Sequence, residues 1–185
     1  MCYNFGKDIR IWLFDGGNIM IDIGKKVIYG IHGVCAVTGM EQQKVGDKRL
    51  NYLILEPLNQ PGSRFMVPAH NEAAMSKVRE LYTLEELERL LNSKEAHTYC
   101  WIEDEGKRKQ TYRELINSGN RIQLMAMIYT LYCHKAQQEK AGRKVHLCDE
   151  NFLRDAEKLL IGELRFVMNM DQNRAKQYLT SCLQK

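Results

Sequence analysis

The stretch VIYGIHGVCAVTGMEQQKVGDKRLNYLILE, residues 27–56, decides the fold of the first part of the chain. It contains three short runs rich in β-branched and other apolar side chains, at residues 27–29, 33–40 and 52–56. Glycines bound the second run, and Gly46-Asp47 marks a turn before the third. Runs of this length between turn residues are typical of antiparallel strands. We therefore expect three consecutive strands in this stretch.

A fourth strand is expected at residues 64–68, after the strong turn signal Asn59-Gln60-Pro61-Gly62. All three prolines of the chain lie at strand ends or in this turn, where a missing N–H breaks no ladder hydrogen bond. Several short strands within about fifty residues predict a small bent sheet or barrel.

From about Ala69 onward the pattern becomes helical. Thr83 and Glu86 have the spacing of a capping box, and leucines follow at helical spacing. Further helices are expected at residues 109–117, 121–141 and 149–168, and from Asp171 to the C-terminus. Strands first and helices afterwards predict an α+β chain with two segregated units. We place the β unit at residues 20–72 and the all-α unit at residues 73–185.

The composition is that of an ordinary globular protein. The 185 residues are 44% hydrophobic and 27% charged, which excludes a disordered chain, and no apolar run is long enough to span a membrane. Six cysteines at irregular spacing, with no C-x-x-C pair, indicate a reduced cytoplasmic protein without a disulfide scaffold or metal site.

Residues 1–19 do not resemble a signal peptide, because they lack an extended apolar core and a cleavage site. Gly16-Gly17-Asn18-Ile19 precede Met20, and codons for these residues can include a ribosome-binding sequence just upstream of a start codon. We interpret residues 1–19 as a leader that is not translated in the cell. The alternative is a real extension with its own packing.

The chain carries no recognisable catalytic or cofactor-binding motif, so we expect neither enzymatic activity nor a cofactor. The net charge of +4 is modest, but positive residues gather in one region. Lys107, Arg108, Lys109 and Arg113 lie close together there. This cluster predicts a face that contacts phosphates, and the alternative is a solvated helix face.

Five segments resemble the CarD/CdnL family of bacterial transcription regulators. Residues 24–34, GKKVIYGIHGV, resemble the family's opening pattern G-D-x-V-V-Y-P-x-H-G-V-G, and residues 52–55 and 66–69 resemble its later strands. Ser118-Gly119-Asn120 and residues 156–164 resemble patterns of the family's helical half. The order and spacing of these segments cover essentially all of residues 20–183.

This resemblance implies a Tudor-like (SH3-like) N-terminal barrel that binds the β subunit of RNA polymerase, and a helical half that contacts promoter DNA. Trp101 resembles the family's tryptophan that wedges into the minor groove at the upstream edge of the transcription bubble. Around it we expect phosphate contacts from Lys107, Arg108, Lys109 and Arg113. We expect polymerase contacts from the positions near the family's polymerase-facing arginines, which are Lys44, Arg49, Arg64, Phe65 and Met66.

The chain also departs from the family pattern. Gly30 stands where a proline is usual, and the acids Glu103, Asp104 and Glu105 follow Trp101 where well-known members have arginines. We therefore keep two hypotheses. The first is a monomeric, polymerase-bound and nucleoid-associated regulator that modulates the stability of open complexes with little DNA sequence specificity. The rival is a protein-interaction adaptor with no DNA role, in which the barrel docks on polymerase or another partner and the helices bind a second protein. For Trp101 itself, the alternative is packing between helices.

Overall fold

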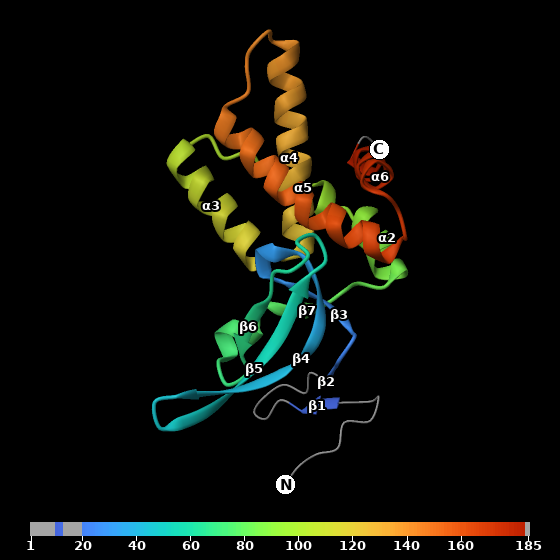
Figure 1. The fold of residues 1–185 in the computed structure, drawn as a ribbon. Helices are drawn as coiled ribbons and strands as arrows, with labels where there is room; N and C mark the ends of the chain where they lie inside the picture. Colours follow the sequence, from blue (N-terminus) through green and yellow to red (C-terminus); the bar gives the residue numbers. More distant parts are fainter. Residues whose placement is uncertain (1–9, 13–19, 184–185) are drawn as a thin grey trace. The chain divides into compact units, whose positions relative to one another are not determined.

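The computed structural model describes residues 10–12 and 20–183, and the chain divides into two compact units (Figure 1). Unit 1 is Met1–Leu81 and unit 2 is Tyr82–Lys185. The boundary falls later than the expected residue 72, because the segment that follows contributes a further strand to the sheet of unit 1. The prediction of an untranslated leader concerns residues that lie almost wholly outside the described ones.

Unit 1 is built on an antiparallel sheet of five strands in the order β6-β5-β4-β3-β7. The strands are β3 (Lys26–Tyr29), β4 (Val34–Val45), β5 (Lys48–Pro57), β6 (Phe65–Pro68) and β7 (Val78–Glu80). A separate pair joins β1 (Arg10–Trp12) to β2 (Met20–Asp22). The four expected strands are confirmed, and β7 was not predicted. Among the described residues no pairing joins β6 to β7, the two outer strands of this sheet.

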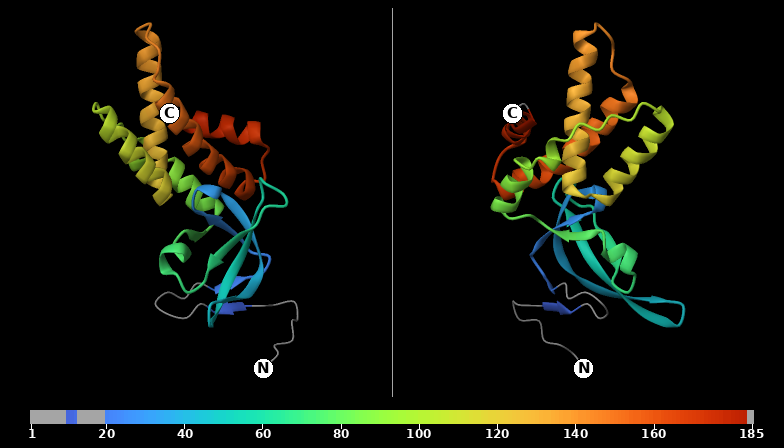
Figure 2. Two further views of the ribbon diagram at one scale, coloured as in Figure 1. Left: turned by 60° about the vertical axis from the view of Figure 1, so that its left-hand side comes forward. Right: turned by 180° about the vertical axis from the view of Figure 1, so that it is seen from behind.

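The β4–β5 hairpin is the longest feature of this sheet (Figure 2). Its tight turn at Gly46-Asp47 is confirmed, and Gly46 has a φ of 62° that favours glycine. The register shifts between Val37 and Gly39, which marks a bulge, and bulges increase the local bend of a strand. Because β6 pairs only with residues 52–55 of β5, the outer part of the hairpin extends beyond its neighbours as a two-stranded ribbon.

The core of unit 1 lies on one face of the sheet, since side chains alternate along each strand. It consists of Val27, Cys35, Val37, Leu53, Leu55, Val67, Met75 and Val78. Met75 comes from the short helix α1 (Glu72–Met75), which packs against β6. Burial raises the pKa of the Cys35 thiol to about 11, so Cys35 behaves as an inert core residue.

Unit 2 is all helical. Its helices are α2 (Leu84–Leu91), α3 (Glu105–Ser118), α4 (Arg121–Lys140), α5 (Leu147–Val167) and α6 (Gln172–Leu183), with a 3-10 turn at Glu95–His97. The capping box is confirmed: the Thr83 N–H donates to Glu86 Oε2 at 2.7 Å, and the Glu86 N–H donates to Thr83 Oγ1 at 3.2 Å. Helix α3 begins earlier than expected, because Asp104 caps it through the Lys107 N–H at 2.7 Å.

A buried ion pair lies within the apolar core of unit 2. The Arg121 guanidinium donates two hydrogen bonds of 2.8 Å to Glu163, whose Oε1 also accepts the backbone N–H of Tyr82 at 2.8 Å. The guanidinium carbon lies 4.0 Å from the centre of the Tyr82 ring. These contacts fasten the first residue of unit 2 to helices α4 and α5. No helix in the described part of the chain is long and apolar enough to cross a membrane.

Candidate functional site

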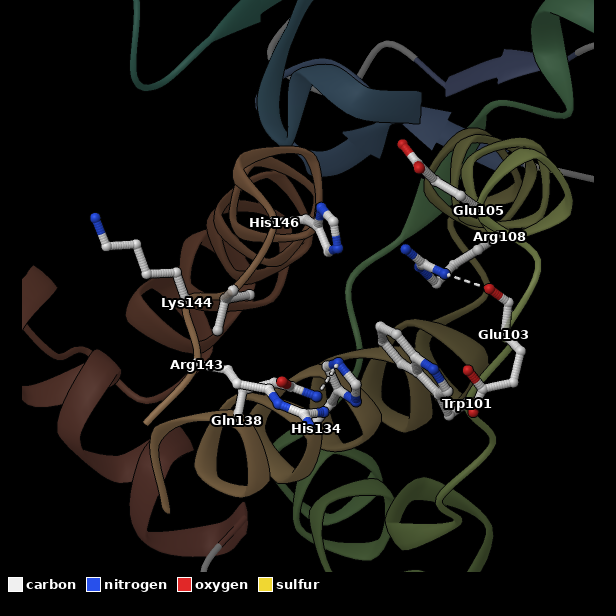
Figure 3. Close-up of a pocket in the computed structure, with 10 residues that line it drawn as sticks. Trp101, Glu103, Glu105, Arg108, His134, Gln138, Arg143, Lys144 and His146 are labelled. Atoms are coloured by element: carbon white, nitrogen blue, oxygen red, sulfur yellow. Dashed lines mark hydrogen bonds between the residues drawn. The ribbon is translucent and has the colours of Figure 1, made fainter. Parts of the chain in front are cut away.

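Trp101 lies in an extended segment between the 3-10 turn and α3, and its ring is held by two side chains (Figure 3). The ring stacks on His134 of α4, with centroids 3.4 Å apart and planes 8° apart. The guanidinium carbon of Arg108 lies 4.4 Å from the ring centroid. Trp101 is partly buried and packs against the helical core. The tryptophan is therefore neither a freely exposed wedge nor a fully buried core residue.

Arg108 connects the parts of this site through its hydrogen bonds, and it is only 4% exposed. Its guanidinium donates to both carboxylate oxygens of Asp149, at 3.0 and 3.2 Å. It also donates to the backbone carbonyls of Ile102 and Glu103, at 2.8 and 3.2 Å. We predicted Arg108 as a phosphate contact, but the structure places its charge in an internal ion pair. Because it holds the two residues that follow Trp101, Arg108 fixes the path of this segment.

His134 forms the other side of the tryptophan stack. Burial lowers the pKa of His134, and the nearby positive charge of Arg108 acts in the same direction, while Asp149 opposes it. The ring is therefore neutral at neutral pH. Its Nε2 lies 3.3 Å from the amide nitrogen of Gln138, whereas its buried Nδ1 has no hydrogen-bond partner among the described residues.

A cavity of about 390 Å³ opens beside Trp101, within unit 2. Three segments line it: the approach to α3, the end of α4 and the connection from α4 to α5. Figure 3 shows Arg143 extending toward Gln138 and His134, while Lys144 and Glu105 point away. The site thus combines an aromatic pair with charged groups of both signs.

The predicted cations of α3 do not form one surface. Lys107 and Arg113 are exposed, whereas Lys109 is partly covered and forms an ion pair with Glu105 one turn earlier. Residues four apart share a helix face, so Lys109 and Arg113 lie on the same side and Lys107 lies on another. Arg108 points inward, as described above.

The predicted polymerase contacts divide between the two faces of the sheet. Phe65 is half-buried and packs against the core of unit 1, with its ring centroid 4.2 Å from that of His32. Arg64 is exposed and donates to Glu41 at 3.1 Å, and Gln43 approaches the Met66 sulfur at 3.6 Å. The outer hairpin places Lys44 directly opposite Arg49, and both are exposed.

Sequence reasoning missed the roles of His134 and Asp149. No sequence pattern singles out His134, and Asp149 marks only the start of an expected helix. No group of three or more ligand side chains in the described residues is suited to a metal. The partners of Trp101 lie far from it along the chain, so no local pattern reveals them.

Comparison with known proteins bears on unit 1. Residues 21–79 match the family model of the CarD-like/TRCF RID domain, which confirms the resemblance over that segment. The match covers less than half of the chain and ends within β7, so it agrees with a β unit that extends past residue 72. A search of curated proteins found no match. Residues 21–79 of this chain are therefore similar to the CarD-like/TRCF RID domain family.

Proposed function

We propose that the chain is a transcription regulator that binds the β subunit of RNA polymerase through unit 1 and contacts promoter DNA through unit 2. The observation that carries the proposal is the match of residues 21–79 to an RNA polymerase-interacting domain. The proposal assigns no catalytic step and no cofactor to the chain. A regulator of this kind acts as a monomer on the polymerase, and is nucleoid-associated through it.

Strand β6 is the feature of unit 1 best suited to polymerase binding. It pairs with β5 on one side and stands at the edge of the sheet. An edge strand offers backbone N–H and C=O groups to an added strand, and such pairing demands few fixed side chains. Arg64 and Met66 lie at this edge and would supply specificity. The bulge in β4 supports a finer proposal, that the sheet curls toward the family's Tudor-like barrel.

The outer β4–β5 hairpin offers a second contact to polymerase. Lys44 and Arg49 face each other across the strands, and like charges directly opposite each other are destabilising. Neither forms an ion pair within the described residues, so an acidic partner surface would relieve their repulsion.

Unit 2 would contact DNA through Trp101 and the cations of α3. The ring of Trp101 has contacts on its faces, so an edge of the ring would meet a base step. Lys109 and Arg113, which share one side of α3, would meet phosphates, which fix position without reading sequence. Such contacts at the upstream bubble edge would lengthen the life of open complexes.

The proposal is tested by reversing one charge at each edge of the sheet. Arg64→Glu in the full chain should weaken binding to the isolated β subunit by about tenfold, because a charged contact contributes roughly 1.5–3 kcal/mol. Lys77→Glu makes the same change beside β7, at the opposite edge, and should leave binding unchanged. Equal effects of the two variants would place the polymerase contact elsewhere.

A second candidate function is the protein-interaction adaptor without a DNA role. It is favoured by the contacts that already hold Trp101 and by the acids Glu103 and Glu105 beside the cavity. Fork-junction DNA binding by the full chain separates the two candidates. Salt-sensitive binding supports the regulator, and no binding at low salt supports the adaptor.

A further inference from the structure

We infer that the cavity beside Trp101 is a binding site for a phosphate group, held by Arg143, Gln138 and His146. This site goes beyond the proposed function, because it needs neither polymerase nor duplex DNA. Its volume of about 390 Å³ is in the range of small-molecule sites. Its lining is largely polar, which suits an anion better than an apolar ligand.

The charges around the cavity leave a cationic side. Arg108 is neutralised by Asp149, and Glu105 is neutralised by Lys109. The charged lining residues without an ion pair among those described are Glu103, on the Trp101 side, and Arg143 and Lys144, on the opposite side. A phosphate group placed on the second side meets a net positive charge.

The end of α4 places the donors of this side. Gly142, with a φ of 66°, lets the chain turn so that the Arg143 N–H donates to the Gln138 carbonyl at 2.9 Å. Arg143 and Gln138 therefore stand together at the cavity wall, with the guanidinium of Arg143 directed toward His134 (Figure 3). A guanidinium and an amide are good donors to phosphate oxygens, and Arg binds them in a forked geometry.

The start of α5 adds to the same side. His146 lies at the cavity and precedes α5, and no side chain caps the first N–H groups of this helix. Free N–H groups at a helix start favour an anion. They add to the positive charge of Arg143 on this side of the cavity.

The phosphate could belong to a free nucleotide or to the end of a DNA strand, and the test distinguishes these sources. In the full chain carrying Trp12→Phe, Trp101 is the only tryptophan and reports on the cavity by its fluorescence. Inorganic phosphate, AMP, and a short single strand with either a 5′-phosphate or a 5′-hydroxyl are titrated, and calorimetry checks each result. A response to AMP but not to the 5′-phosphorylated strand identifies a free ligand, and the reverse identifies a strand end.

The Arg143→Ala variant should weaken binding of the responding phosphate by about tenfold, since a charge-assisted hydrogen bond is lost. Lys140→Ala removes an exposed charge one turn earlier that does not line the cavity, and should change binding by less than about twofold. Saturable binding that depends on Arg143 and on the phosphate supports the site. No response to any of the phosphate probes, or equal weakening by the two variants, overturns it.

Discussion

Trp101 is the residue whose role the structure changes most. If Trp101 were a family-like wedge, its ring would be exposed. If it were a core residue, truncating it would lower the free energy of unfolding by about 3–5 kcal/mol. Its partial burial and its contacts to His134 and Arg108 place it between these cases. The type of residue was predictable from the sequence, whereas its partners were not, because they come from helices α3 and α4.

Replacing Trp101 by alanine should lower the free energy of unfolding by about 1–3 kcal/mol, because one aromatic pair and one cation–π contact are lost. If the ring also contacts DNA, open complexes formed with the folded variant should decay about tenfold faster than those formed with the unaltered chain. Thermal melting and open-complex decay are measured on the same variant. If the variant is destabilised but its folded fraction supports normal open-complex lifetimes, Trp101 has only a structural role.

The buried pair Arg108–Asp149 makes a second prediction. Asp149→Ala should cost about 3–5 kcal/mol of stability, because it leaves the Arg108 charge buried without its partner. The double variant Arg108→Met with Asp149→Leu should recover most of that loss, since an apolar pair needs no compensation. Chemical denaturation gives both values. Equal stability of Asp149→Ala and the unaltered chain would show that Arg108 is solvated.

His134 makes the stability depend on pH. Its folded pKa is lowered from 6.5, so the unfolded chain takes up the proton first as the pH falls. The contribution of neutral His134 is complete above about pH 6.5 and declines below it. Arg108, Asp149, Glu103 and His146 act on this ring. The melting temperature should fall more between pH 7.5 and 5.5 in the unaltered chain than in His134→Gln, and parallel curves would contradict this assignment.

Among the elements, helix α3 shows how a basic run in sequence differs from a basic surface. The run at residues 107–109 suggested three neighbouring phosphate contacts. A helix turns about 100° per residue, so consecutive residues point in different directions, and one of the three points inward to Asp149. The capping signal was more reliable, because Thr83 and Glu86 act within a single turn.

Phosphate contacts on α3 should appear as a change in the salt dependence of DNA binding. Replacing Lys109 and Arg113 by alanine should reduce the slope of log affinity against log salt by about two, one for each contact. Binding should weaken alike on unrelated sequences. A matched control removes two exposed cations of another helix, Arg174 and Lys176. If control and test slopes agree, the α3 cations are ordinary solvated side chains.

For the whole chain, the change from period-two to helical patterning predicted the α+β class and four of the strands correctly. Strand β7 was not predicted, because its three residues, Val78–Glu80, are too few to show an alternation of apolar and polar side chains. Only their pairing with β3 makes them a strand. Its addition moved the domain boundary to Leu81. Long-range pairing and ion pairs such as Arg108 with Asp149 join residues distant in sequence, so they leave no local signal.

Binding of the separate units to RNA polymerase tests the central claim most directly. Residues 20–81, residues 82–185 and the full chain are titrated against the purified β subunit. Residues 20–81 keep the whole sheet, so they should bind within about tenfold of the full chain, while residues 82–185 should not bind. Binding by residues 82–185 alone, with a folded but inactive fragment 20–81, would contradict the proposed function.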